Sequence, residues 1–374
     1  MKQRVTIEDI AQKVGCSKSL VSLALSNKYG VSESVRSKII MEAIKMGYEF
    51  KNNKSHTSDI LSNHRKRIFV CFPKSMLEDD NYWMEIITHV EQHLRRNFCF
   101  TQISSWDKDS EADDLPYTFY RSGCDGLIGF ATEIPPDSMS KLQAVGKPMI
   151  FVDSGFYMPG LVNVKAANHN GMYWLAQYLE GQGHSHMCFV GDASREETFA
   201  ERRGGIRRYV ELHPHIRMDY VDSPIDSDIS EWVSLGHLHR YLEQEDRATV
   251  LICLNDAVAA RVYETAEELG LKIPDDISVA GFDGIKRGVW LKPALTTCAV
   301  DRDRVAEMAT ALLLNQLNNA SGKLFDGVRV EIPVGIIVRD SVKNLNTESC
   351  QAGRSAMPGS RVRSPADECA EEQR

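Results

Sequence analysis

Residues 5–25 read VTIEDIAQKVGCSKSLVSLAL. The apolar residues in this stretch recur at the spacing of one helix face, first before Gly15 and again after it. Thr6 is placed to cap the first helix, and Asp9 follows three residues later, which is a variant of the capping box. Gly15 interrupts the apolar pattern, and Ser17 can cap a second helix. The stretch therefore predicts two short helices joined by a tight turn.

A third helix is predicted after Ser32, because apolar residues continue at helical spacing as far as Gly47. Three such helices form a helix-turn-helix unit, in which the N-terminal end of the second helix enters the major groove of DNA. Lys18 can then contact guanine or a phosphate, and Leu23 can contact a thymine methyl group. Phosphate contacts through hydroxyls, helix N-termini or charge are predicted for Thr6, Ser17, Ser32 and Arg36, and the exposed face of the second helix presents Lys18, Ser19 and Ser22.

The charge distribution along the chain supports this interpretation. The 374 residues carry a net charge of −8, which alone argues against a nucleic-acid partner. Residues 1–67, however, contain 13 Lys and Arg against 6 Asp and Glu, whereas the remainder contains 31 against 46. A basic N-terminal end on an acidic body is the asymmetry expected when one end meets phosphate.

The rest of the chain alternates buried strands with amphipathic helices. Residues 49–66 are polar and predict a linker, and the Ser-, Gly-, Arg- and Glu-rich residues 346–374 predict a disordered tail. Between them, strand and helix patterns alternate, which is typical of doubly wound parallel α/β sheets. The predicted strands are Ile68–Phe72, Gly126–Phe130, Pro148–Val152, His186–Val190, Thr249–Leu254 and Ile277–Phe282, with helices at 81–96, 170–181 and 256–270.

These segments resemble the lactose-repressor/galactose-repressor (LacI/GalR) family. The N-terminal pattern Val5–Ala11, Gly15-Cys16-Ser17, Val21-Ser22, Val31–Arg36 and Gly47-Tyr48 is similar to that of the family's DNA-binding head. Later landmarks are Gly183-His184, Asn255–Ala259, Ile277–Asp283 and Pro293–Thr297, so the resemblance covers residues 4 to 345. The chain departs from the family at the linker, which lacks the A-R-x-L hinge pattern, and at Ala167, where the family has aspartate.

The resemblance implies a domain organisation and a mode of action. A helix-turn-helix head (1–48) and a linker (49–66) would precede a two-lobed domain (67–345) similar to periplasmic sugar-binding proteins. The N-lobe would comprise residues 68–163 and 294–323, and the C-lobe residues 164–293 and 324–345. A homodimer would bind a near-palindromic operator in double-stranded DNA, most often as a repressor, and a small-molecule effector in the cleft between the lobes would control binding. Either inducer or co-repressor logic fits.

The effector-binding residues follow from matched positions and from their chemistry. Carboxylates, an amide and an arginine with an aromatic wall suit a polyol, so a sugar is favoured over a nucleobase. Arg202 precedes a stretch, 203–206, that is expected to form a turn. Trp83 could instead belong to the core, and Asp153 and Asp283 could cap helices. The predicted residues are Tyr82, Trp83, Asp153, Thr198, Arg202, Asn255 and Asp283.

Two other classes of protein, an enzyme and a solute receptor, fit the sequence less well. An enzyme is disfavoured because phosphate-loop, dinucleotide and nucleophile-elbow motifs are missing, so no catalytic residue and no cofactor is predicted. Three His-x-His pairs, at 184/186, 213/215 and 237/239, suggest zinc but lack a nearby third ligand, so no metal is predicted. A solute receptor would not explain residues 4–48. With no signal peptide, no membrane helix and nine scattered cysteines, a cytoplasmic, nucleoid-associated protein with no membrane partner is expected.

Overall fold

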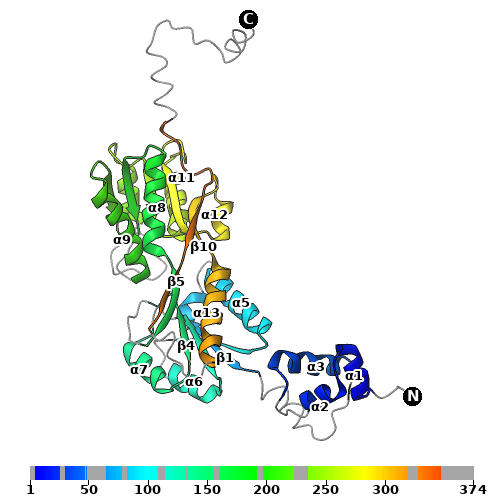
Figure 1. The fold of residues 1–374 in the computed structure, drawn as a ribbon. Helices are drawn as coiled ribbons and strands as arrows, with labels where there is room; N and C mark the ends of the chain where they lie inside the picture. The colour runs from blue at the N-terminus through cyan, green and yellow to red at the C-terminus, as the bar shows by residue number, and fades with distance from the viewer. Residues whose placement is uncertain are drawn as a thin grey trace, which may run out of the picture. The chain divides into compact units, whose positions relative to one another are not determined.

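The computed structural model describes residues 5–25, 30–46, 48, 65–77, 82–107, 114–130, 134–154, 160–191, 197–222, 235–318 and 327–346. The predicted linker, apart from its last two residues, and the predicted tail beyond residue 346 lie outside these ranges. The chain divides into two compact units, of which the first contains residues 1–79, 83–164 and 302–330 and the second contains residues 80–82, 165–301 and 331–374. Figure 1 shows the elements of both units in chain order.

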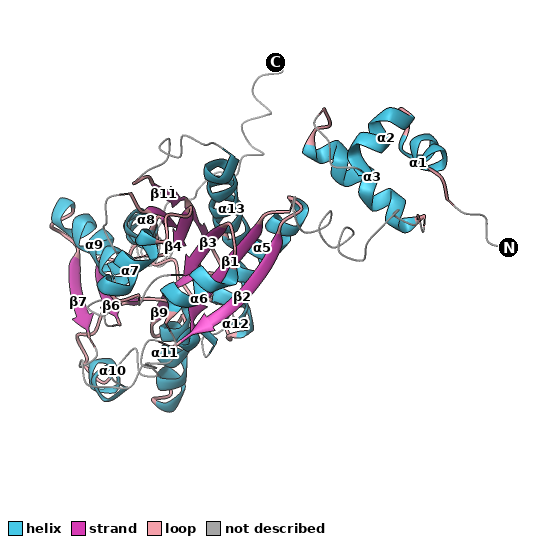
Figure 2. Ribbon diagram, turned by 90° about the horizontal axis from the view of Figure 1, so that it is seen from below, coloured by secondary structure: helices cyan, strands magenta, loops and turns pink. Residues whose placement is uncertain are grey.

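The N-terminal head consists of helices α1 (Ile7–Val14), α2 (Lys18–Leu25) and α3 (Glu33–Lys45), which pack against one another (Figure 2). The predicted capping box is confirmed, because the Asp9 amide donates to Thr6 Oγ1 at 3.3 Å and the Thr6 amide donates to Asp9 Oδ2 at 2.7 Å. Gly15 ends α1 at φ 74°, in the left-handed region that favours glycine. Ser17 caps α2 by accepting from the Leu20 amide at 3.2 Å.

A small apolar core holds the three helices together. It is built from side chains contributed by each helix, so no two helices alone would bury it. Its fully buried members are Ile10, Val21, Ala24, Ile39 and Ala43. The face of α2 opposite this core is consequently left to solvent.

The first unit contains a six-stranded sheet in the order β11-β5-β4-β3-β1-β2. Its strands are β1 (Arg67–Pro73), β2 (Phe100–Trp106), β3 (Gly126–Phe130), β4 (Met149–Val152), β5 (Val162–Ala166) and β11 (Arg329–Ile332). The pairs from β2 to β5 are parallel. A 3₁₀ turn (Lys74–Leu77) and the helices α5 (Tyr82–Arg96), α6 (Leu115–Ser122), α7 (Pro136–Ala144) and α13 (Arg302–Asn318) complete the unit.

The second unit contains a six-stranded sheet in the order β12-β10-β9-β8-β6-β7. Its strands are β6 (His186–Val190), β7 (Arg217–Val221), β8 (Val250–Cys253), β9 (Ser278–Asp283), β10 (Thr296–Val300) and β12 (Val334–Ile337), of which β12 is antiparallel to β10. The helices are α8 (Asn168–Gly181), α9 (Glu197–Leu212), α10 (Leu235–Leu242), α11 (Asp256–Glu268) and α12 (Lys286–Trp290).

Both sheets repeat one topology. Numbered within each unit, their first five strands lie in the order 2-1-3-4-5, which is a doubly wound arrangement with its switch point between the first and third strands. Ligands of such sheets bind beyond the carboxyl ends of the strands near that point. The predicted α/β class is therefore confirmed, and each of the six predicted strands has a counterpart in the structure.

The predicted lobe boundaries are wrong at two strands. β10 was expected with the first lobe, but it pairs with β9 in the second sheet, Thr296 opposite Ala280. β11 was expected with the second lobe, but it lies beside β5 in the first sheet, where the Asn163 amide donates to the Val328 carbonyl at 3.1 Å. Pairing between strands far apart in sequence sets these positions, and local periodicity carries no information about it.

Helix α9 corrects a second expectation, and it packs closely against α8. The stretch 203–206, expected as a turn, lies inside α9. Gly205 allows the contact, because a Cβ atom there would lie 2.1 Å from the His169 carbonyl oxygen of α8. Gly205, one of the two glycines that suggested a turn in the sequence, is therefore a packing requirement of two helices.

His184 fastens the segment that follows β12 to the second unit. Its ring lies 2.8 Å from Thr249 Oγ1 and 3.1 Å from the Lys343 carbonyl oxygen, and the residue is 1% exposed. Burial lowers the pKa of His184 to about 4, although the hydrogen bond to the Lys343 carbonyl opposes this change.

No helix in the described part of the chain has the length and hydrophobicity needed to cross a bilayer.

The free energy of unfolding is expected to fall as the pH drops from 6.5 to about 4, because the unfolded chain protonates His184 while the folded chain does not. The contribution of this residue is at most about 1.4 kcal/mol per pH unit. The substitution His184→Gln removes it, so urea titrations across this pH range should give a shallower dependence for the variant. Parallel dependences for the two proteins would contradict the assignment.

Candidate functional site

The exposed face of α2 carries the polar residues predicted from the sequence. Lys18 is the first residue of the helix and its side chain is 63% exposed, while Ser19 and Ser22 are exposed and Leu23 is half-buried. The predicted hydroxyl contacts also lie at the surface, since Thr6, Ser17 and Ser32 are exposed and each directly precedes one of the three helices. The head thus presents hydroxyls and helix N-termini, both of which suit phosphate.

Arg36 does not fit the phosphate contact predicted for it. The residue is 6% exposed, and its guanidinium donates to the carbonyl oxygens of Leu23 at 3.3 Å and Ala24 at 3.2 Å. These carbonyls belong to the last turn of α2, which has no intrahelical donors left for them. Arg36 therefore holds α2 onto α3, a role that only the fold reveals.

Lys18 has a partner that sequence reasoning missed. Its ammonium forms an ion pair with the carboxylate of Glu8, which lies in the first turn of α1. The two side chains remain 63% and 67% exposed. The pair joins two helices on the outer face of the head, and ten residues of sequence separation gave no local signal for it.

In the second unit, Arg202 joins three segments, two of which carry predicted effector ligands. Its Nε donates to Asn168 Oδ1 at 2.9 Å, its Nη1 to the Leu254 carbonyl at 3.0 Å, and its Nη2 to Asp283 Oδ1 at 2.7 Å. Leu254 follows β8, and Asp283 is the last residue of β9. Arg202 therefore lies at the carboxyl ends of the central strands, next to the switch point of this sheet.

Arg202 is 5% exposed, and its guanidinium contacts both polar and aromatic groups. It stacks over the Phe282 ring with the Cζ atom 4.0 Å from the ring centroid. A buried guanidinium is tolerated only when its donors and charge are satisfied, which the Asp283 carboxylate does here. The ion pair forms a preorganised polar centre at the strand ends.

The other predicted ligands of this unit lie nearby but differ in their roles. Thr198 is buried in the first turn of α9, one turn before Arg202. Asn255 is the N-cap of α11, where its Oδ1 accepts from the Val258 amide at 2.8 Å. Its side chain thus has a structural function that the strand-end pattern alone did not reveal.

Two further residues in this region were not among the predicted ligands. Asn168 accepts from Arg202, and Asp256 accepts from Thr297 Oγ1 at 2.6 Å and from the Ile285 amide at 2.9 Å. Burial, with the negative charge of Asp283, raises the pKa of Asp256 to about 7. Asp256 belongs to the sequence landmark Asn255–Ala259, and Asn168 directly follows Ala167, where the chain departs from the family pattern. These positions were the available signal.

The three remaining predicted residues lie at the beginning of α5 and directly after β4. Trp83 is the second residue of α5 and packs edge-on against Phe130, the last residue of β3, with ring centroids 6.0 Å apart. Tyr82 is buried. Asp153 follows β4 and is 7% exposed. Its φ is 51° and that of Asp283 is 107°, backbone conformations that non-glycine residues rarely adopt and that tend to occur at functional sites.

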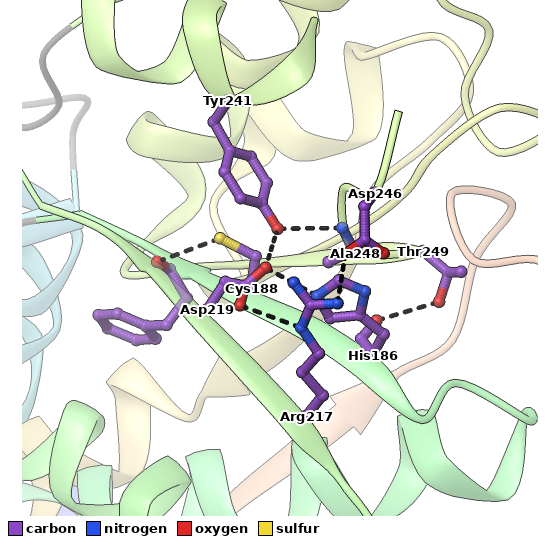
Figure 3. Close-up of polar contacts among 9 residues, drawn as sticks. His186, Cys188, Arg217, Asp219, Tyr241, Asp246, Ala248 and Thr249 are labelled. Atoms are coloured by element: carbon purple, nitrogen blue, oxygen red, sulfur yellow. Dashed lines mark hydrogen bonds and ion pairs between the residues drawn. The ribbon is translucent and has the colours of Figure 1, made fainter. Parts of the chain in front are cut away.

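The histidine pairs considered as zinc ligands are engaged elsewhere. Figure 3 shows His186 against Asp219, with Nε2 2.7 Å from Oδ2, and Tyr241 donating to the same carboxylate oxygen at 2.8 Å. Although burial raises the pKa of Asp219, the hydrogen bonds from His186 and Tyr241 lower it overall. The His184 ring contacts the Lys343 carbonyl oxygen, as described above. Within the described ranges, no three His, Cys, Asp or Glu side chains are grouped to hold a metal ion.

Comparison with known proteins identifies both parts of the chain. The family model described as "Bacterial regulatory proteins, lacI family" matches residues 6–49, and "Periplasmic binding protein-like domain" matches residues 176–342. The HTH-type transcriptional repressor PurR of Photorhabdus laumondii is 25% identical over 341 residues, covering 90% of this chain and 96% of the relative. The chain belongs to the lacI family. PurR of Pectobacterium carotovorum, 26% identical with the same coverage, is another relative of this lacI-family chain.

Solved structures show the same fold as this lacI-family chain. The lac repressor dimer bound to operator and the anti-inducer ONPF aligns with a TM-score of 0.65 at 17% identity, covering 91% of this chain and all of the other. A LacI family transcriptional regulator from Enterococcus faecium with bound ribose aligns with a TM-score of 0.62 at 22% identity over 75% of this chain. The predicted combination of a helix-turn-helix head with a periplasmic-binding-protein-like domain is thus confirmed.

Replacing Arg202 by Met should lower the free energy of unfolding by about 3–5 kcal/mol, because it leaves the Asp283 carboxylate buried without its partner. The neighbouring Arg203 pairs with Asp222 at the surface, so Arg203→Met should cost no more than about 1 kcal/mol. Urea denaturation of the two variants provides the comparison. Equal losses would show that the Arg202 ion pair is not a stabilising centre.

Proposed function

We propose that this chain is a repressor that binds a near-palindromic operator as a homodimer and that a small carbohydrate controls its affinity for DNA. The observation that carries the proposal is the polar face of α2, with Lys18 and Ser19 exposed at the beginning of the helix and the opposite face buried in the head core. A helix presented in this way suits the major groove. The relatives described as repressors support repression over activation.

The contacts to DNA are proposed residue by residue. Base contacts are assigned to Lys18, Ser19, Ser22 and Leu23, because they lie on or beside the exposed face of α2. Phosphate contacts are assigned to Thr6, Ser17 and Ser32 at the beginnings of the three helices. Arg36 supports α2 from behind and is not part of this set.

The effector-binding residues are proposed from the chemistry that each unit offers at or near its strand ends. Arg202 and Asp283 offer fixed donors and acceptors to hydroxyl groups, Asp153 adds a carboxylate, and Trp83 offers an aromatic face to the C–H groups of a sugar. Thr198, Asn255 and Tyr82 are assigned to the same set. Structures of similar fold that contain ribose, cellobiose or D-xylulofuranose favour a sugar.

Control of DNA binding is proposed to act by population shift. A ligand changes an equilibrium only by its difference in affinity between two states. The Arg202–Asp283 pair connects α9 with β9, so a ligand that bonds to this pair favours one arrangement of those elements over another. The same mechanism serves an inducer or a co-repressor, according to which state binds operator.

Selection of bound sequences from a random duplex pool tests the DNA-binding proposal, using the full-length protein at near-physiological salt. One near-palindromic sequence should be enriched, and Lys18→Ala should weaken one base preference in each half-site by about 1–3 kcal/mol. The control is Lys13→Ala, an exposed lysine in the last turn of α1. Absence of any enriched sequence, with or without added metabolite mixtures, would refute the proposal. A uniform loss across sequences would reassign Lys18 to a phosphate.

Titration of the selected operator complex with monosaccharides, disaccharides and nucleobases tests the effector proposal. One sugar should change the operator affinity of the wild-type protein, and Asp283→Asn should lose most of this response because the ligand loses a fixed acceptor. Asp246→Asn changes an exposed acid of the same unit and serves as the control. A response to nucleobases alone, or an unchanged response of Asp283→Asn, would contradict this assignment. Fluorescence anisotropy of labelled DNA gives the affinities.

A further inference from the structure

Lys18 occupies a position that does not favour a lysine. It is the first residue of α2, where the helix dipole presents its positive end, and the first turn of α2 contains no acidic residue. A cation there is unfavourable for the helix, so helix stability does not explain this side chain. Its exposure on the face assigned to DNA indicates that its function lies outside the folded head.

Glu8 supplies the missing negative charge from another helix. It lies in the first turn of α1, and its Oε1 forms the ion pair with Lys18 Nζ. Because the two side chains are 67% and 63% exposed, the pair contributes little to folding stability. The exposure also leaves lone pairs of the carboxylate and protons of the ammonium available to a third partner.

An ammonium beside a carboxylate matches one edge of DNA. Lysine only donates hydrogen bonds and ionised glutamate only accepts them. In the major groove, a G·C pair presents the guanine O6 and N7 acceptors beside the cytosine N4 amino donor. An A·T pair places the adenine N6 donor between two acceptors, adenine N7 and thymine O4, so its acceptors are not adjacent. Guanine O6 and N7 are adjacent acceptors that one ammonium can contact together, which favours G·C over A·T for this pair of side chains.

We propose that Glu8 and Lys18 together read one G·C base pair, with the Lys18 ammonium donating to guanine O6 or N7 and the Glu8 carboxylate accepting from cytosine N4. The inference rests on the proposed operator binding and adds Glu8 as a specificity residue. Glu8 also repels phosphates wherever this base pair is absent. Its negative charge therefore weakens binding to unrelated DNA, which raises the ratio of specific to non-specific affinity.

The test compares the wild-type protein with Glu8→Ala, Glu8→Gln and Lys18→Met in the random-pool selection and then on two duplexes. These duplexes carry the selected site with and without a G·C to A·T change at the base pair whose preference Lys18→Met removes. The change should weaken wild-type binding about 10- to 100-fold. Glu8→Ala should reduce this ratio to near one, whereas Glu8→Gln, which keeps an acceptor oxygen, should retain part of it. Both Glu8 variants should bind unrelated DNA more tightly than wild type.

Controls separate this role from a structural one. Lys13→Met and Glu42→Gln make the same charge changes elsewhere in the head, on α1 and α3, and should keep the wild-type preference. Thermal unfolding of the Glu8 variants checks that the head remains folded. If Lys18→Met alters one base preference but both Glu8 variants keep it, Lys18 reads the base alone and the inference is wrong. Enrichment of A·T at that position overturns the inference as well. If the wild type enriches no sequence at all, the proposed operator binding itself is wrong.

Discussion

The buried guanidinium of Arg202 determines how the second unit is organised at its strand ends. Removing a charge from water is costly, so the N–H groups of the buried guanidinium need acceptors within hydrogen-bonding distance. Acceptors are supplied by Asn168 at the beginning of α8, the Leu254 carbonyl after β8 and Asp283 at the end of β9. Elements far apart in sequence are thereby fixed around one polar centre, at the place where a doubly wound sheet binds its ligand.

The first unit repeats the topology without repeating this centre. Its strand ends carry Asp153 at positive φ and Trp83 against Phe130, which gives a carboxylate and an aromatic face, and the residues described there include no buried arginine. The two sheets therefore offer different chemistry from the same 2-1-3-4-5 order. Fold similarity to other members of the lacI family explains the order, whereas ligand choice depends on these individual side chains.

The head illustrates how an exposed site is distinguished from a supporting contact. Arg36 and Lys18 are both cations of a basic segment, and both were predicted to meet DNA. The first is buried against the carbonyls of α2, where it completes the helix end. The second remains at the surface, paired with Glu8 and opposed to the helix dipole. Charge alone does not separate these two roles, but burial does.

Local patterns in the sequence were sufficient for the capping box of Thr6 and Asp9, the end of α1 at Gly15, the buried strands and the family resemblance. The cap, the helix end and the strands each depend on residues within one turn or one strand, so spacing and residue type specify them, and the resemblance depends on short motifs of this kind spread along the chain. The sheet to which β10 and β11 belong, the burial of Arg36, the helical glycines of α9 and the Glu8–Lys18 pair depended on folding. Strand pairing, close helix packing and ion pairs join residues distant along the chain, and their energies come from contacts that no local pattern contains.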